Sequence, residues 1–144
     1  VMGVTPLQAR LLLELGSASI AGELRTNVLI LEYDDETSAA LRTILEDLGH
    51  SICGIAHSRA EAVSLAQSSR IGLIISDRTL CDGTCGYEAV LALGEYHNAA
   101  VIITTNRPDE VKSDKRLSHV TVVPKPYLTD TMRASISQAL LLNR

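Results

Sequence analysis

The feature that most constrains this chain is an alternation, from residue 27 onward, of short apolar segments with stretches of helical periodicity. Each apolar segment is nearly continuous, as strands are when helices cover both faces of a parallel sheet. Strands and helices that alternate in this way form βα units. We therefore predict an α/β fold whose core is a doubly wound, five-stranded parallel sheet of strand order 2-1-3-4-5. The predicted strands lie near 28–32, 52–56, 71–76, 100–104 and 119–123.

Helix signals fill the intervals between these strands. Apolar residues recur at helical spacing from Leu41 to Leu48, and Gly49 follows as a C-terminal cap. Ser58 and Glu61 form an S-x-x-E capping box, which marks the start of a second helix. Further helices are predicted over 85–96, 108–116 and 128–142.

The beginning of the chain differs from the rest. Thr5 and Pro6 are typical residues for the start of a helix, and a leucine-rich helical face follows them. We predict an N-terminal helical extension over 1–26 and a βα domain over 27–144. The apolar face of the extension must be buried against that domain, a second copy or a missing segment. The chain begins with Val1 rather than Met, so we expect a piece of a longer protein.

Composition argues against several classes of protein. Hydrophobic residues make up 46% and charged residues 21% of the 144 residues, as in folded rather than disordered chains. No apolar run approaches the roughly 20 residues of a membrane span, so we expect no membrane contact. A net charge of −4 argues against a nucleic-acid binder, which needs clustered Lys and Arg. Three cysteines without zinc spacing predict reduced thiols in a cytoplasmic protein.

Acidic side chains gather at the predicted carboxyl ends of the strands. Ligands of doubly wound sheets bind at this edge, where the strand order reverses between the first and third strands. Glu32 with Asp34 or Asp35 follows the first strand, and Asp77 follows the third. Such carboxylates raise one another's pKa unless a cation neutralises them, and Mg²⁺ prefers oxygen ligands of this kind. We therefore predict a Mg²⁺ site here, although Asp34 and Asp35 fit equally well as residues that begin the first helix.

Two more predicted strand ends reach the same edge. Thr105 supplies a hydroxyl after the fourth strand, and Lys125 supplies an ammonium after the fifth. Lys125 stands between Pro124 and Pro126, which restrict the backbone on both sides. An aspartate beside a metal ion, a hydroxyl and a lysine is suited to carry a phosphoryl group, because these groups offset the charge of its oxygens. We predict that Asp77 is this aspartate.

These residues resemble the receiver domains of two-component response regulators, and the resemblance runs without gaps over residues 28 to about 142. The segment from Asp77 to Gly86 is similar to the receivers of general-stress-response regulators, in which a sigma-factor-like domain precedes the receiver. The segments "ASISQAL" (134–140) and, more loosely, "TPLQARLLLEL" (5–15) resemble the same subgroup. The resemblance implies the flavodoxin-like receiver fold and a role in phosphorelay signalling rather than an enzymatic activity.

The resemblance also implies what the site residues do and which partners they meet. Asp77 would accept the phosphoryl group from a histidine kinase or a phosphotransfer protein, and Thr105 and Lys125 would contact its oxygens. The peptide bond between Lys125 and Pro126 resembles one that is often cis in receivers. The output would reach a partner of a sigma/anti-sigma pathway. A homodimer would use the N-terminal helix, or the surface formed by the predicted helices that start near 108 and 128 and the strand between them.

Metal binding is the point at which the chain departs from the resemblance. Glu32 would hold a water bound to Mg²⁺, Asp77 would bind the ion directly, and the backbone carbonyl of Thr79 would complete the shell. A second acid of the family falls on Tyr33, whose phenol is neutral at pH 7 because its unperturbed pKa is about 10. Asp34 is a further candidate ligand. The alternative function is therefore a pseudo-receiver, a protein-interaction module that works without phosphorylation.

Two enzyme classes fit the sequence poorly. An aspartyl-phosphate hydrolase needs a second acid two residues after the nucleophile, where this chain has Thr79. A dinucleotide-dependent enzyme needs a G-x-G-x-x-G motif after the first strand, and none is present there. We therefore expect a signalling domain rather than an enzyme.

Overall fold

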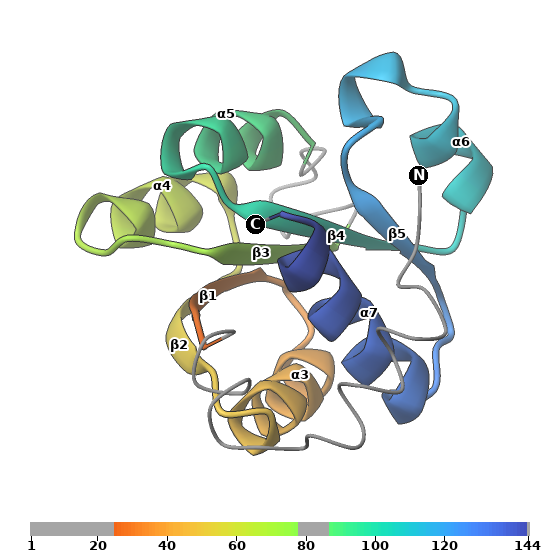
Figure 1. Ribbon diagram of the computed structural model, residues 1–144. Coiled ribbons are helices and arrows are strands. Elements are labelled where there is room, and N and C mark those ends of the chain that lie inside the picture. The colour runs from red at the N-terminus through yellow and green to blue at the C-terminus, as the bar shows by residue number, and fades with distance from the viewer. Residues whose placement is uncertain (1–24, 78–86, 144) are drawn as a thin grey trace.

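The computed structural model describes residues 25–77 and 87–143, and these residues form a five-stranded parallel sheet flanked by helices (Figure 1). The strand order is β2-β1-β3-β4-β5, which confirms the predicted doubly wound topology. Apart from Arg25 and Thr26, the predicted N-terminal extension lies outside the described residues. In chain order the elements are β1 (Asn27–Leu31), α3 (Asp35–Asp47), β2 (Ser51–Ala56), α4 (Arg59–Gln67), β3 (Leu73–Asp77), α5 (Tyr87–His97), β4 (Ala100–Thr105), α6 (Pro108–Lys112), the 3₁₀ helix η1 (Lys115–Leu117), β5 (Thr121–Pro124) and α7 (Thr129–Leu142).

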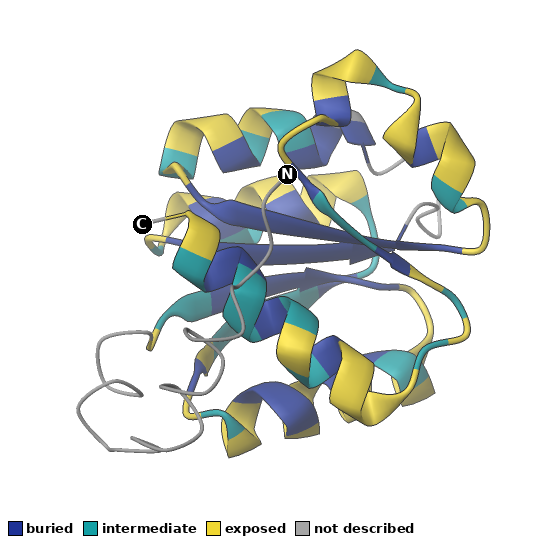
Figure 2. Ribbon diagram, turned by 45° about the vertical axis from the view of Figure 1, so that its right-hand side comes forward, coloured by how far each residue is buried: buried dark blue, intermediate teal, exposed yellow. Residues whose placement is uncertain are grey.

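Two hydrophobic cores lie on opposite faces of this sheet. Side chains alternate along β1, so that Leu29 and Leu31 pack into one core and Val28 and Ile30 into the other. Helices α4 and α5 cover the first face, and α3 and α7 cover the second (Figure 1). Burial of each such Leu or Ile contributes roughly 1.5–3 kcal/mol. The helices keep exposed outer faces (Figure 2), and no helix of the described ranges is long and apolar enough to cross a membrane.

The local helix signals are confirmed at two positions. Gly49 follows the C-terminus of α3 with φ +89°, a conformation that glycine adopts without strain. Ser58 is the N-cap of α4, and its hydroxyl accepts a hydrogen bond from the Glu61 N–H at 3.2 Å. The Glu61 carboxylate reaches back to the His57 N–H at 3.5 Å, one residue before the cap. The capping box therefore fixes where α4 begins.

The predicted helix over 108–116 is wrong in its extent. Helix α6 ends at Lys112, and a separate 3₁₀ turn, η1, begins at Lys115. Asp114 lies between them, and its carboxylate accepts a hydrogen bond from the Arg116 N–H at 3.0 Å. An aspartate in this role caps a new turn rather than continuing a helix, which explains the break.

The cap at Ser58 gives a direct test of local stability. Replacing Ser58 with Ala removes the acceptor for the Glu61 N–H, so we expect the free energy of unfolding to fall by about 1 kcal/mol. Urea unfolding of the two proteins measures this difference. Ser64→Ala is the matched control, because Ser64 is exposed within the same helix, and Ala there is neutral or slightly stabilising. Equal effects of the two substitutions would contradict the capping role.

Candidate functional site

The carboxyl ends of four strands bring the predicted site residues to one edge of the sheet. Glu32 follows β1, Asp77 ends β3, Thr105 ends β4 and Lys125 follows β5. Parallel pairing sets this alignment, since Asp77 is in register with Thr104 on the neighbouring strand. Glu32, Asp77 and Thr105 are all buried, with 2%, 6% and 0% of their surfaces exposed. The structure thus brings these four residues to the carboxyl ends of neighbouring strands.

Asp77 and Lys125 form an ion pair across this edge. The Lys125 Nζ lies 2.7 Å from Asp77 Oδ1, and the aspartate side chain is only 7% exposed. The backbone of Lys125 is held as well, because its N–H donates to the Thr105 carbonyl oxygen at 2.7 Å. The peptide bond between Lys125 and Pro126 is cis. Lys125 is therefore not a mobile surface lysine but a charge placed on a buried carboxylate.

Glu32 is a buried acid that the lysine neutralises only in part. Burial raises the pKa of Glu32 above its usual 4.5, and the negative charge of Asp77 raises it further. A hydrogen bond from the Asp34 N–H, at 3.2 Å, and the charge of Lys125 act in the opposite direction. The balance leaves the protonated form of Glu32 favoured more than in water. When both acids are ionised, two carboxylates and one ammonium thus leave a net negative charge at this edge, which a bound cation would neutralise.

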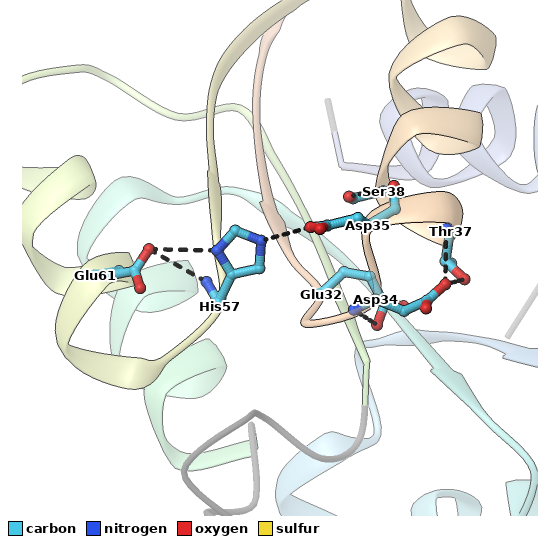
Figure 3. A network of polar contacts seen from close by, with 7 residues as sticks. All are labelled: Glu32, Asp34, Asp35, Thr37, Ser38, His57 and Glu61. Carbon is cyan, nitrogen blue, oxygen red and sulfur yellow. Dashed lines mark hydrogen bonds and ion pairs between the residues drawn. The ribbon is translucent and has the colours of Figure 1, made fainter.

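Neither Tyr33 nor Asp34 supplies the second acidic ligand that the resemblance implies after Glu32. Tyr33 is 52% exposed, whereas its neighbour Glu32 is buried. Asp34 is the N-cap of α3, and its Oδ2 accepts hydrogen bonds from the Thr37 N–H at 2.9 Å and the Thr37 hydroxyl at 2.6 Å (Figure 3). These bonds lower the pKa of Asp34. The open choice in the sequence between capping and metal binding is therefore decided toward capping for this oxygen of Asp34.

Asp35 also serves the helix rather than the site. It is the first residue of α3, and its Oδ1 lies 3.3 Å from His57 Nε2 (Figure 3). On its other side, His57 Nδ1 lies 3.6 Å from the Glu61 carboxylate. The imidazole thus bridges the beginnings of α3 and α4 next to the site. Because Asp35 contacts His57, the acids that remain for the site at the strand ends are Glu32 and Asp77.

Thr105 has a defined local role in this structure. Its hydroxyl accepts a hydrogen bond from the Arg107 N–H at 3.0 Å, in the turn that leads to α6. Arg107 is the N-cap of α6 and supplies no side-chain cap of its own. Thr105 therefore stabilises the turn at its present position. Thr79, the predicted source of a carbonyl ligand, lies in the segment 78–86, outside the described residues.

Tyr127 is a neighbour of the site that sequence reasoning missed. Burial raises the pKa of its phenol, and the charges of Glu32 and Asp77 raise it further. Its position directly after Lys125 and Pro126 was the only available signal, because the phenol approaches the acids only once β5 is in place. The neutral hydroxyl adds no charge to offset the two carboxylates.

The donor set agrees in kind, but not in number, with a Mg²⁺ site. Two buried carboxylates are the hard oxygen ligands that this ion prefers. Among the residues that the structure describes, however, no three His, Cys, Asp or Glu side chains are grouped so that they could hold an ion. Glu32 and Asp77 would hold Mg²⁺ together with water molecules. Such a site is weaker than one with three carboxylates.

Comparison with known proteins gives similar chains and similar structures. No protein-family model matches the chain. The chain is 32% identical, over its whole length, to the phyllosphere-induced regulator PhyR of Methylorubrum extorquens, of which it covers 54%. It is also 32% identical to the anti-anti-sigma factor PhyR of Bartonella quintana, with a TM-score of 0.76, and 92% of this chain matches 54% of that one. The chain thus spans about half the length of these regulators.

A solved receiver domain is matched over most of its own length. The receiver domain of PhyR from Erythrobacter litoralis is 34% identical to this chain, with a TM-score of 0.75. The match covers 81% of this chain and 91% of that domain. The strand order β2-β1-β3-β4-β5 of this chain is that of a receiver fold. The chain therefore belongs to the receiver-domain family of response regulators, on the branch of the PhyR stress-response regulators.

Proposed function

We propose that this receiver domain accepts a phosphoryl group on Asp77. The observation that carries the proposal is the Asp77 carboxylate, buried at the end of β3 and in contact with Lys125 at 2.7 Å. A buried carboxylate with one fixed ammonium is an oriented nucleophile whose product charge already has a counter-ion. Glu32 lies close enough for its charge to interact with that of Asp77, and it is the second acid of the site.

The reaction balances without a further reagent if the donor is a phosphohistidine of a kinase or a phosphotransfer protein. A carboxylate oxygen of Asp77 forms the new bond to phosphorus, while the bond from phosphorus to the donor nitrogen breaks. The electron pair of that bond stays with the histidine. The Lys125 Nζ then shifts from Asp77 to the phosphoryl oxygens. Mg²⁺ held by Glu32 and Asp77 would supply further positive charge to offset the negative charge of the phosphoryl group. The Thr105 hydroxyl can also contact the phosphoryl oxygens if it gives up the hydrogen bond that it accepts from the Arg107 N–H.

The proposed partners follow from this role. A histidine kinase or phosphotransfer protein supplies the phosphoryl group, and the surface of α6, β5 and α7 carries the change to a second copy or to another protein. The Bartonella relative bears the name anti-anti-sigma factor, which supports an output in a sigma/anti-sigma pathway. The domain acts as a signalling switch rather than as an enzyme, because the position two residues after Asp77 is Thr79 instead of an acid.

A pseudo-receiver is the second candidate function, and one observation favours it. Tyr33 stands where a metal ligand is expected and is 52% exposed, while Asp34 uses one oxygen to cap α3. If Mg²⁺ does not bind, the pair of Asp77 and Lys125 persists and the domain acts only through docking or dimerisation.

Asp77→Asn tests the acceptor directly. Intact-mass spectrometry after incubation with acetyl phosphate and Mg²⁺ should show one added phosphoryl group on the natural chain and none on the variant. Asp47→Asn is the control, because Asp47 is an exposed carboxylate on α3 and the variant should still be phosphorylated. A phosphoryl group on the Asp77→Asn protein would exclude Asp77 as the acceptor.

Tyr33→Asp tests the missing ligand. An added carboxylate beside the ion should lower the Kd for Mg²⁺ by about tenfold. One more unit charge at about 4 Å contributes about 1 kcal/mol or more. Amide shifts of residues 32–35 in a Mg²⁺ titration measure the Kd. Tyr33→Phe should leave it unchanged. If neither Mg²⁺ nor beryllofluoride shifts any amide of the natural chain, the pseudo-receiver function is correct.

Glu32→Gln tests the electrostatics through pH. A carboxyl whose pKa is raised in the folded state stabilises the fold at acidic pH, and this contribution is lost as pH rises through the folded-state pKa. Without metal at about pH 7, Glu32→Gln should therefore increase the free energy of unfolding in urea, whereas Glu46→Gln on exposed α3 surface should not. With Mg²⁺ present, the natural protein should instead have the larger free energy of unfolding, because the ion stabilises only the charged Glu32 carboxylate. An unchanged stability of Glu32→Gln in both conditions would refute this account.

A further inference from the structure

At the opposite edge of the sheet, Thr26 is held from two sides just before β1 begins. Its N–H donates to His50 Nδ1 at 3.2 Å, and its carbonyl oxygen accepts from the Ser51 N–H at 3.0 Å. On the other side, the Gly72 N–H donates to the Asn27 carbonyl oxygen at 2.9 Å. The Thr26 side chain fills the space in which a Cβ of Gly72 would lie. Thr26 thus lies between the turn after α3 on one side and Gly72 on the other.

The turn after α3 places His50 for this contact. Gly49 takes φ +89°, and the His50 N–H then donates to the Leu45 carbonyl oxygen at 3.0 Å. The His50 residue is only 8% exposed. Because Nδ1 accepts the Thr26 N–H, it carries no proton, and the neutral ring has its proton on Nε2. The imidazole is therefore the one titratable group in the fastening of Thr26.

Burial governs the charge state of His50. Burial lowers the pKa of the imidazole below its usual 6.5, and no charged neighbour contributes to this change. The charged groups on the surrounding segments are Arg25, Glu46, Asp47 and, paired with Asp47 at 4.0 Å, Arg133. A proton on Nδ1 would turn the acceptor into a donor that faces the N–H of Thr26. It would also place a charge away from water, so protonation and the hydrogen bond exclude each other.

We propose that His50 is an acid-sensitive acceptor that holds Thr26, at the start of β1, against the α3–β2 turn. Neutral His50 keeps this junction of Thr26 with the turn closed, and protonation releases the Thr26 N–H. The proposal does not depend on the chemistry of Asp77, because Thr26 precedes β1 whereas Asp77 lies at the carboxyl end of β3. It makes the junction responsive to pH without any change at Asp77.

Two neighbouring features fit this role. His97 makes a similar contact, in which its Nδ1 accepts the Ile71 N–H at 3.3 Å, next to the glycine that packs on Thr26. A hollow of about 400 Å³ adjoins the junction, and Arg25, Thr26, His97 and Asn143 are among its lining residues. Because Thr26 itself lines this hollow, water has access to the residue that His50 would release.

The direction of the pH effect follows from the lowered pKa. The unfolded chain takes up a proton on His50 near pH 6.5, whereas the folded chain does so only at lower pH. The contribution of His50 is therefore complete above about pH 6.5 and is lost as pH falls through the folded-state pKa. The junction is therefore held at neutral pH and is released as pH falls through the folded-state pKa of His50.

Amide hydrogen exchange of the full chain at about pH 7 and about pH 5 tests the proposal, after correction for the intrinsic rates. Protection of the Thr26 amide should fall by about tenfold in acid, the equivalent of one hydrogen bond. The Ile102 amide in the sheet interior serves as reference and should stay protected. A loss of protection at both amides would mean general unfolding, and unchanged protection of Thr26 would refute the fastening.

Variants of His50 make the test specific. His50→Asn places an amide oxygen near the position of Nδ1, so it accepts the same hydrogen bond but does not titrate. Thr26 should then be protected equally at both pH values, and His50→Ala should lose the protection at both. His119→Asn is the control, because His119 is exposed and distant in sequence, and Thr26 should keep its natural response. If His50→Asn shows the same acid loss as the natural chain, another group is responsible.

Discussion

Two carboxylates that lie close together out of water need positive charge, and this constraint governs the carboxyl edge of the sheet. Glu32 and Asp77 are brought there by parallel pairing of β1 and β3, which no change in a single loop would undo. Lys125 meets part of the demand by its 2.7 Å contact with Asp77. A divalent ion would offset the remaining negative charge and would leave positive charge for the oxygens of a phosphoryl group. The chemistry proposed for this domain therefore follows from an imbalance built into its strand ends.

In the proposed function, Asp77 and Lys125 would serve as the nucleophile and the lysine of a receiver, whereas the proposed metal site has one acid fewer. Tyr33 faces solvent, and Asp34 stabilises the start of α3 instead. Phosphorylation with weaker metal affinity and signalling without phosphorylation both fit this pattern, and they differ only in whether Mg²⁺ binds at all. At the amino-terminal end of β1, the hydrogen bond from Thr26 to His50 holds the start of the strand through a group for which we propose a response to acid.

Sequence alone predicted the fold because its signals are short-range and repeated. The alternation of faces along β1 and the cap at Ser58 depend only on neighbouring residues, and both are found in the structure. The break at Asp114 was missed because helical spacing of apolar residues does not show that a polar side chain will begin a new turn. The placement of Tyr127 and the bond from Thr26 to His50 join distant segments, so they become visible only when the sheet is assembled.

The most direct test of the central account is fluorine NMR of beryllofluoride added with Mg²⁺ to the full chain. Beryllofluoride mimics a phosphoryl group on a carboxylate, so a receiver of the kind proposed should give resolved signals of bound fluoride. These signals should disappear in Asp77→Asn and weaken in Lys125→Ala, which removes the ammonium 2.7 Å from Asp77. Absence of any bound signal at saturating Mg²⁺, with the chain still folded, would contradict the account and leave the domain as a docking module.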